Sequence, residues 1–247
     1  MPVLRLRHTP KPLQSLDASN AHVPPGQPRF ERMGGVKYIF WDNDGVLVDT
    51  ETFYYEATRT VLDTVGIPLT EKDYQELFLR QAAGAWHFAR AKGLSEDEVR
   101  ELRRKRFDLY SDLVRGRDTV IPGVRGALAN LGKTFRQAVV TSSRRYHFNL
   151  IHENSGLLEY FEFVLAREDY TLSKPHPEPY LKALERTGLS ADECLVVEDS
   201  ERGLTAATDA GLRCWVVPSP LTKDLRFERA ERILDSVEQV AEQLMAA

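Results

Sequence analysis

Short apolar runs rich in strand-forming residues recur along this chain, and helical periodicity fills the stretches between them. Strands are expected at residues 38–41, 137–140, 161–166, 194–197 and 214–217. Helices are expected at residues 124–131, 145–154, 177–187, 200–210 and 229–245. Strands that alternate with helices of this length form crossover units of a parallel sheet. The pattern therefore predicts the α/β class, with a doubly wound, Rossmann-like parallel sheet.

The first and second strands are separated by a long stretch in which we find no convincing strand. Apolar residues spaced four apart begin at Phe53, and capping-box pairs beginning at Thr70 and Ser95 indicate two further helices. We interpret this stretch as a small α-helical cap inserted into the sheet domain. The expected organisation is an N-terminal extension at 1–35, an α/β core at 36–50 and 118–247, and the cap at 51–117.

The first apolar run ends in two carboxylates, Asp42 and Asp44, followed by Gly45. In extended backbone, side chains two residues apart point the same way, and the carboxyl end of a strand is where open α/β sheets bind ligands. Two close carboxylates repel each other, so the pair implies either a bound cation such as Mg²⁺ or one raised pKa. The alternative is that both are ordinary turn or capping aspartates.

Three later segments carry polar groups that could meet this pair. Thr141 and Ser142 follow a strand and offer donors to phosphate oxygens, or simply cap the next helix. Lys174 is held beside a proline and could neutralise a phosphoryl group, or could be a solvated loop lysine. Glu198 and Asp199 end another strand, as metal ligands or as a helix start. The presence of all these groups at predicted strand ends favours a site for phosphate and a metal ion over a chance arrangement.

Composition limits the classes of partner. The net charge of −4 and the pI near 5.9 give no nucleic-acid footprint, and no apolar run is long enough to span a membrane. Cys194 and Cys214 lie in apolar runs, which favours buried reduced thiols and a cytoplasmic location. We predict no protein partner.

The proline-rich extension at residues 1–35 is expected to be poorly ordered. Its basic, acid-poor character weakly matches an organellar presequence, and Met33 offers an alternative start of the chain.

Residues 36–240 resemble the haloacid dehalogenase superfamily, in particular its helical-cap group of phosphoglycolate phosphatases and beta-phosphoglucomutase-like proteins. The resemblance rests on Asp-x-Asp-Gly-Val-Leu-Val-Asp-Thr from Asp42, on Val-Val-Glu-Asp-Ser from Val196, and on Thr141 and Lys174. Trp41 and Asn43 replace the more usual residues around the first aspartate.

The resemblance implies a role for each matched residue. Asp42 would attack phosphorus and become an aspartyl-phosphate, and Asp44 would act as general acid and base. Mg²⁺ would be held by Asp42, the Asp44 backbone carbonyl and Asp199, with Glu198 assisting directly or through water. The phosphoryl oxygens would be bound by Thr141, the Ser142 amide and Lys174.

The same resemblance leaves the activity partly open. Asp44 favours phosphate-ester chemistry, so we predict a Mg²⁺-dependent phosphatase acting on a small phosphorylated metabolite. One alternative is a phosphosugar mutase, although the mutases usually have a histidine where this chain has Tyr54; another is a non-catalytic phosphate-binding protein on the same fold. Tyr54 and Arg80 are the candidate substrate contacts, and Arg80 could equally be solvated. The basic run 100–106 is a solvated face or an attractor of anionic substrates.

Overall fold

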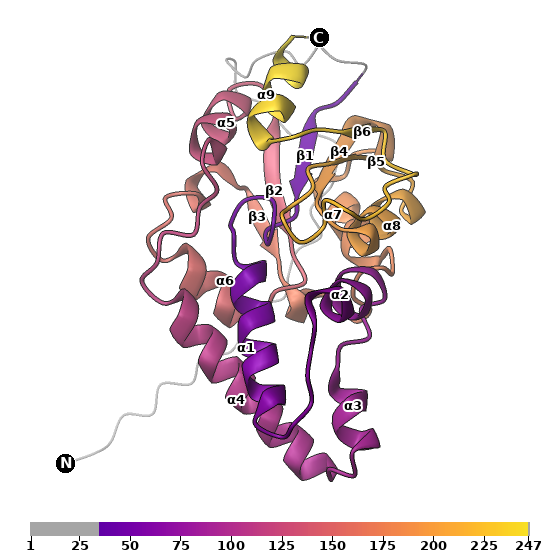
Figure 1. Ribbon diagram of the computed structural model, residues 1–247. Helices are drawn as coiled ribbons and strands as arrows, with labels where there is room; N and C mark the ends of the chain where they lie inside the picture. Colours follow the sequence, from indigo (N-terminus) through magenta and orange to yellow (C-terminus); the bar gives the residue numbers. More distant parts are fainter. Residues whose placement is uncertain (1–34, 247) are drawn as a thin grey trace, which may run out of the picture.

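The computed structural model describes residues 35–246 (Figure 1). The predicted N-terminal extension lies outside this range except for its last residue. The predictions of an organellar presequence and of an alternative start at Met33 concern residues outside this range.

Six parallel strands form one sheet in the order β3-β2-β1-β4-β5-β6. The strands are β1 (Tyr38–Trp41), β2 (Arg136–Val140), β3 (Phe163–Leu165), β4 (Cys194–Glu198), β5 (Arg213–Val216) and β6 (Arg232–Ile233). The predicted α/β class with a doubly wound parallel sheet is therefore confirmed. The direction in which strands are added reverses at β1, so that β1 and β4 lie side by side at the centre.

Both faces of the sheet are covered by helices, because successive strand residues point to opposite sides. Ile39 and Trp41 pack in one core with helices α5, α6 and α9, whereas Tyr38 and Phe40 pack in a second core with α7 and α8. These helices are α5 (Val124–Leu131), α6 (Arg145–His152), α7 (Glu178–Thr187), α8 (Glu201–Asp209) and α9 (Val237–Met245). Single 3₁₀ turns lie at η2 (Leu158–Tyr160), η3 (Arg167–Asp169) and η4 (Ala191–Glu193).

The last predicted helix, 229–245, is wrong in its first half, which contains strand β6. The amide of Leu234 donates to the carbonyl of Val216 at 2.8 Å, so this segment extends the open edge of the sheet at β5. Helix α9 begins only after Ser236, whose side chain accepts from the Gln239 amide. Backbone hydrogen bonding to the otherwise unpaired edge of β5 here outweighs the helical periodicity of the segment.

The cap is helical, and Figure 1 shows it at one end of the sheet, below the strands. Its elements are α1 (Glu51–Asp63), α2 (Glu71–Tyr74), the π-helical turn η1 (Gln75–Arg80), α3 (Trp86–Ala91) and α4 (Glu96–Val114). Thr70 and Ser95 form the predicted capping boxes. Helix α3 was not predicted. A third apolar cluster lies mainly in the cap and includes Leu221 from the segment between β5 and β6.

Cys194 and Cys214 are buried and form no disulfide, as their apolar surroundings predicted. Between residues 35 and 246, no helix combines the length and the apolar character needed to cross a bilayer.

Candidate active site

The polar residues predicted to form a site follow strands that are neighbours in the sheet. Asp42 follows β1, Thr141 follows β2, and Asp199 follows β4, which pairs with β1 on the side opposite β2. All three therefore lie at the carboxyl edge, where the strand order reverses and ligand crevices form in open α/β sheets.

A tight turn after β1 carries the chain across this edge. The carbonyl of Asn43 accepts hydrogen bonds from the amides of Leu47 and Val48, at 2.8 and 3.1 Å. Gly45 has φ +84°, and a Cβ there would lie 2.2 Å from a carboxylate oxygen of Asp199. Only glycine lets the backbone turn in this direction while it passes so close to the second acidic segment.

Lys174 is buried among the acidic groups. Its Nζ donates to Asp42 Oδ1 at 2.8 Å, to Glu198 Oε1 at 2.6 Å and to the carbonyl of Val140 at 2.7 Å. Burial disfavours the ammonium, but the Asp42 and Glu198 carboxylates raise the pKa of Lys174 above its ordinary value. This lysine is therefore a permanent positive charge held between two carboxylates.

The pKa of Asp42 is raised to about 7, first by burial and then by the neighbouring Glu198 charge, while Lys174 opposes the shift. Burial, followed by the charges of Asp42 and Glu198, also raises the pKa of Asp199 well above its ordinary value. The pKa values of Asp42 and Asp199 are raised although Lys174 and the nearby Arg202 carry positive charge, so the cluster favours an additional cation.

The same three carboxylates suit a hard divalent cation. One oxygen from each of Asp42, Glu198 and Asp199 lies within 4.8 Å of the others. Asp199 Oδ2 is buried and has no hydrogen-bond partner among residues 35–246. An unpartnered carboxylate oxygen in an all-oxygen cluster fits Mg²⁺ or a similar ion.

Glu198 is the most constrained of the acidic residues. Its Oε1 accepts from the Tyr180 hydroxyl at 2.7 Å in addition to Lys174, and a Cβ on Gly203 would lie only 2.0 Å from its carboxyl group. Helix α8 therefore packs directly on this carboxylate, which explains the glycine at that position. By accepting a hydrogen bond from Lys174, Glu198 orients the ammonium.

Asp44 is held by hydroxyl groups. Its Oδ2 accepts from Ser143 Oγ at 2.7 Å and from Thr141 Oγ1 at 3.3 Å, and its Oδ1 accepts from Thr50 Oγ1. Thr141, predicted to bind phosphate, thus contacts Asp44, whereas Ser142 lines the adjoining cavity. Ser143 was not among the predicted site residues, although it continues the same run of hydroxyls.

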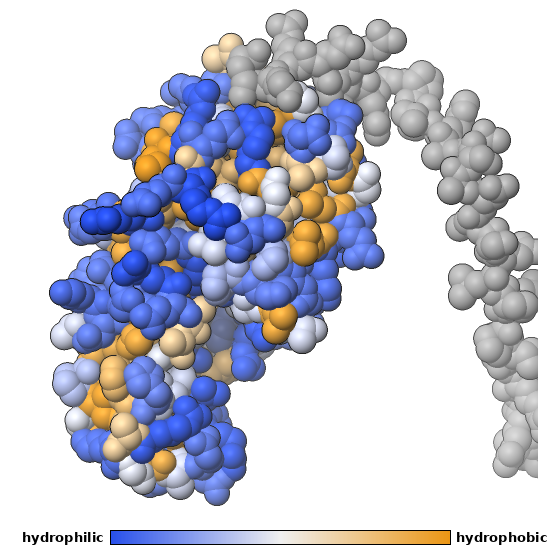
Figure 2. All heavy atoms as spheres, turned by 90° about the vertical axis from the view of Figure 1, so that its right-hand side faces the viewer, coloured by the Kyte–Doolittle hydropathy of each residue, from blue (hydrophilic) through white to orange (hydrophobic). Residues whose placement is uncertain are grey.

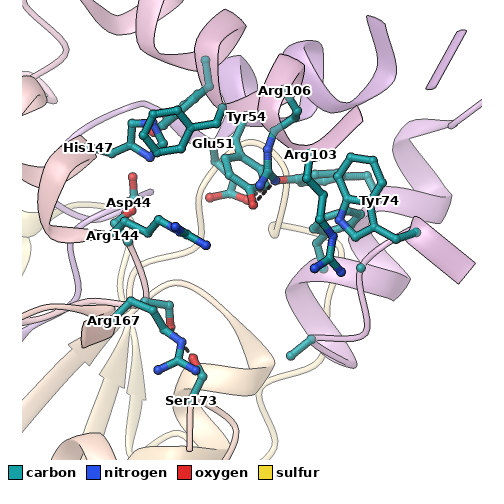
Figure 3. Close-up of a pocket in the computed structure, with 18 of the residues that line it drawn as sticks. Asp44, Glu51, Tyr54, Tyr74, Arg103, Arg106, Arg144, His147, Arg167 and Ser173 are labelled. Atoms are coloured by element: carbon teal, nitrogen blue, oxygen red, sulfur yellow. Dashed lines mark hydrogen bonds between the residues drawn. The ribbon is translucent and has the colours of Figure 1, made fainter. Parts of the chain in front are cut away.

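A cavity of about 740 Å³ lies between the core loops and the cap, with Asp42 and Asp44 in its wall (Figure 3). In the space-filling view, the outline of the molecule is indented between the core above and the smaller cap below (Figure 2). Tyr54 lines the cavity and bonds to Arg106 through its hydroxyl. Arg80 does not line it and instead forms ion pairs with Glu76 and Glu201, at 2.6 and 2.8 Å.

The lining contains a set of arginines larger than the sequence indicated. It comprises Arg103, Arg104 and Arg106 from the cap and Arg144, Arg167 and Arg202 from the core. The basic run at 100–106 was a signal for the first three. No pattern singled out the other three, because their common orientation depends on how three separate segments pack.

Known proteins resemble this chain in sequence and in fold. A family model described as haloacid dehalogenase-like hydrolase matches residues 39–217, from β1 through the cap to just beyond β5. A Bacillus subtilis protein named "Putative phosphatase YhcW" is 32% identical over 212 residues, which cover 83% of this chain and 94% of that protein. The phosphorylated carbohydrates phosphatase of Thermotoga maritima is 30% identical over 179 residues, covering 70% and 81%. The crystal structure of CbbY from Rhodobacter sphaeroides in complex with phosphate is 25% identical with a TM-score of 0.71, covering 83% and 96%.

Proposed function

Because this chain belongs to the haloacid dehalogenase-like hydrolase family, we propose that it is a Mg²⁺-dependent phosphatase acting on a small phosphorylated metabolite, with Asp42 as nucleophile. The observation that carries the proposal is the position of Asp42, which is buried beside the Lys174 ammonium and beside Asp199, whose Oδ2 has no hydrogen-bond partner among residues 35–246. We assign residues 36–50 and 118–247 to the catalytic core and 51–117 to the cap.

In this proposal Asp42 attacks phosphorus, the bond to the leaving oxygen breaks, and an aspartyl-phosphate forms and is then hydrolysed. Lys174 keeps the attacking carboxylate in place and balances charge on the phosphoryl oxygens. Asp44, held by three hydroxyl donors, gives a proton to the leaving oxygen and later takes one from water. Ser142 at the cavity wall and Thr141 beside it would bind the phosphoryl group.

Asp42, Asp199 and the Asp44 backbone carbonyl would hold Mg²⁺, and Glu198 would assist. When bound, the ion would neutralise charge on the phosphoryl oxygens and align them with Asp42. The unpartnered Asp199 oxygen supports this assignment.

The names of two relatives support a phosphatase, and one of these relatives is named a phosphorylated carbohydrates phosphatase. We therefore propose phosphorylated sugars as the first substrates to test. The phosphosugar mutase remains the alternative activity. A coupled assay for interconversion of hexose 1- and 6-phosphates decides between them, since net isomerisation without phosphate release would replace the proposed hydrolysis.

The nucleophile is tested by phosphate release from sugar phosphates, with and without a chelator. Asp42→Asn should abolish the activity, and Asp44→Asn incubated with acetyl phosphate should gain the mass of one phosphoryl group, because the intermediate forms but its hydrolysis lacks a base. Activity that survives in pure Asp42→Asn protein would exclude Asp42 as the nucleophile, both for the phosphatase and for the mutase reaction.

The metal site is tested separately from turnover. Mg²⁺ should raise the thermal unfolding temperature of the wild type, because an ion bound only by the folded state stabilises it by mass action. Asp199→Asn should lose most of this rise. An equal rise in both proteins would place the ion elsewhere.

A further inference from the structure

A chain of buried polar side chains runs from the end of helix α6 to Asp44. Asn43, His152 and Ser155 are 0%, 2% and 5% exposed. His152 Nε2 lies 2.7 Å from Asn43 Oδ1, and Asn43 Nδ2 lies 3.3 Å from Asp44 Oδ2. Apolar side chains could fill the same space without the cost of burying polar groups. The polar chain therefore indicates a role at Asp44.

Ser155 sets the direction of the hydrogen bonds at one end of this chain. Its oxygen accepts from the Leu157 amide at 3.1 Å. The acceptor nearest to its own hydroxyl proton is His152 Nδ1 at 2.9 Å, against 3.4 Å for the His152 carbonyl. Burial lowers the pKa of His152 to about 4, so near pH 7 its imidazole is neutral and has a single N–H. Because Nδ1 accepts, that N–H lies on Nε2 and donates to Asn43 Oδ1.

Asp44 requires the same direction at the other end. With its oxygen bound by His152, the Asn43 amide presents its nitrogen to Asp44 Oδ2. The reversed amide would place its oxygen against an ionised carboxylate oxygen, and neither of these atoms has a proton to share. The two ends of the chain therefore agree on one orientation of the Asn43 amide.

Asn43 differs in kind from the other groups that bind the Asp44 carboxyl group. Ser143 Oγ and Thr141 Oγ1 also contact Oδ2, and Thr50 Oγ1 contacts Oδ1. These three groups are hydroxyls, which can donate to a bare carboxylate oxygen or accept from a protonated one, whereas an amide N–H can only donate. Among these four partners, Asn43 is therefore the one that distinguishes the two oxygens, because it keeps Oδ2 unprotonated.

We infer that Asn43, oriented by His152, is a positioning residue that keeps Asp44 Oδ2 as an acceptor and assigns the transferable proton to Oδ1. The inference rests on the proposed role of Asp44 as general acid and base. In the first step the proton passes from Oδ1 to the leaving oxygen while the bond of that oxygen to phosphorus breaks. In the second step a proton of the attacking water passes to Oδ1. When residue 43 cannot donate, both oxygens can hold the proton, and only a fraction of the enzyme carries it where it is transferred.

The choice of leaving group separates this role from general damage to the fold. A sugar alkoxide is a poor leaving group and needs the proton, whereas p-nitrophenolate leaves as an anion. The first turnover is measured by rapid quench, because hydrolysis of the aspartyl-phosphate needs Asp44 with either substrate. Asn43→Leu and His152→Leu should slow the first turnover of a sugar phosphate about 10-fold or more, while that of p-nitrophenyl phosphate stays within about threefold.

Two further variants serve as controls. His152→Gln keeps a side-chain N–H donor for Asn43 and should bring the sugar-phosphate rate back to within about threefold of the wild type. Gln137→Leu breaks another buried pair, in which Gln137 accepts from Trp41 Nε1 at 3.0 Å. Gln137 lies near the start of β2, at the opposite end of that strand from Thr141. Its loss should lower the unfolding temperature without changing either first-turnover rate by more than about threefold.

The pattern of losses decides the inference. Slowing confined to the sugar phosphate and restored by His152→Gln supports it. Equal slowing on both substrates, no slowing on either, or His152→Gln behaving like His152→Leu would overturn it. If Asn43→Leu fails to fold, the His152 pair gives the same answer.

Nuclear magnetic resonance tests the inference without turnover. Nitrogen spectra near neutral pH should show His152 with its proton on Nε2 and none on Nδ1. Asn43→Leu should shift the carbon signal of the Asp44 carboxyl group, and Gln137→Leu should not. A proton on Nδ1, or an Asp44 signal that Asn43→Leu leaves unmoved, would overturn the inference. If the wild type releases phosphate from neither compound, the proposed function fails, and these spectra still decide whether Asn43 positions Asp44.

Discussion

The two walls of the cavity differ in burial and in origin. The core wall contains strand-end carboxylates around the Lys174 ammonium, with Asp42, Asp199 and Lys174 all buried. The cap wall contains Glu51 and guanidiniums that lie on aromatic rings, where Arg103 is exposed and Arg106 is half-buried. From this difference we infer that the buried core wall carries out the reaction and that the more exposed cap wall determines substrate specificity.

This division has a measurable consequence. Changes in the core wall should lower kcat and alter folding stability, because its charges are buried and balance one another. Changes in the cap wall should act mainly on KM, because its side chains contact parts of the substrate that do not react.

Lys174→Met should be the most damaging single change in the core wall. It leaves Asp42 and Glu198 buried with no ammonium between them, which should cost about 3–5 kcal/mol of unfolding free energy and lower kcat on the order of 10³-fold. Denaturant unfolding and phosphate release measure the two effects. Lys182→Met is the control, because Lys182 forms an exposed pair with Glu178, so its loss should leave unfolding and turnover nearly unchanged.

His152 should make the core sensitive to acid. Its pKa falls from 6.5 in the unfolded chain to about 4 when buried, so between these values the unfolded state binds more protons. Unfolding free energy is therefore lost as pH falls from 6.5 through 4, by about 3 kcal/mol from this group. The wild type minus His152→Gln difference should show this loss, which isolates it from the opposite effect of Asp42. A difference that does not change with pH would contradict the assignment.

Gly203→Ala should lower the stability of the protein through a steric clash with the core wall. The added Cβ would lie 2.0 Å from the Glu198 carboxyl group, so helix α8 or the carboxylate must shift, at about 1–3 kcal/mol. Gly126→Ala is a matched helical control with no atom within 4 Å of the new Cβ, and should be neutral or stabilising by up to about 1 kcal/mol. Thermal unfolding compares the two. Equal behaviour would mean that α8 is not packed on Glu198.

The same contrast explains how far the sequence could be interpreted. The strand ends carrying Asp42, Thr141 and Asp199 were predicted because a parallel sheet brings the carboxyl ends of its strands to one edge. Lys174 was found through its neighbouring proline. These are consequences of local pattern and topology, and the family relationship agrees with them.

The arginines were less predictable than the strand ends, because their positions depend on contacts between distant segments. Arg80 was weighed as a substrate contact or a solvated residue, and its ion pair with Glu201 joins residues 121 positions apart. Arg144 and Arg167 carry no pattern that distinguishes them from surface arginines. Their direction follows from the turns after β2 and β3, which periodicity does not describe.

Tyr54→Phe should have the smallest effect, and it tests whether a change in the cap wall alters KM without altering kcat. It removes the hydroxyl that bonds to Arg106 but keeps the ring on which the guanidinium lies. One such hydrogen bond corresponds to a rise in KM of about two- to fivefold with kcat unchanged. Tyr55→Phe is the control, because the Tyr55 hydroxyl bonds to the Leu69 carbonyl and does not line the cavity. A fall in kcat for Tyr54→Phe would instead place this hydroxyl in the reaction, and the division of labour between the two walls would not hold.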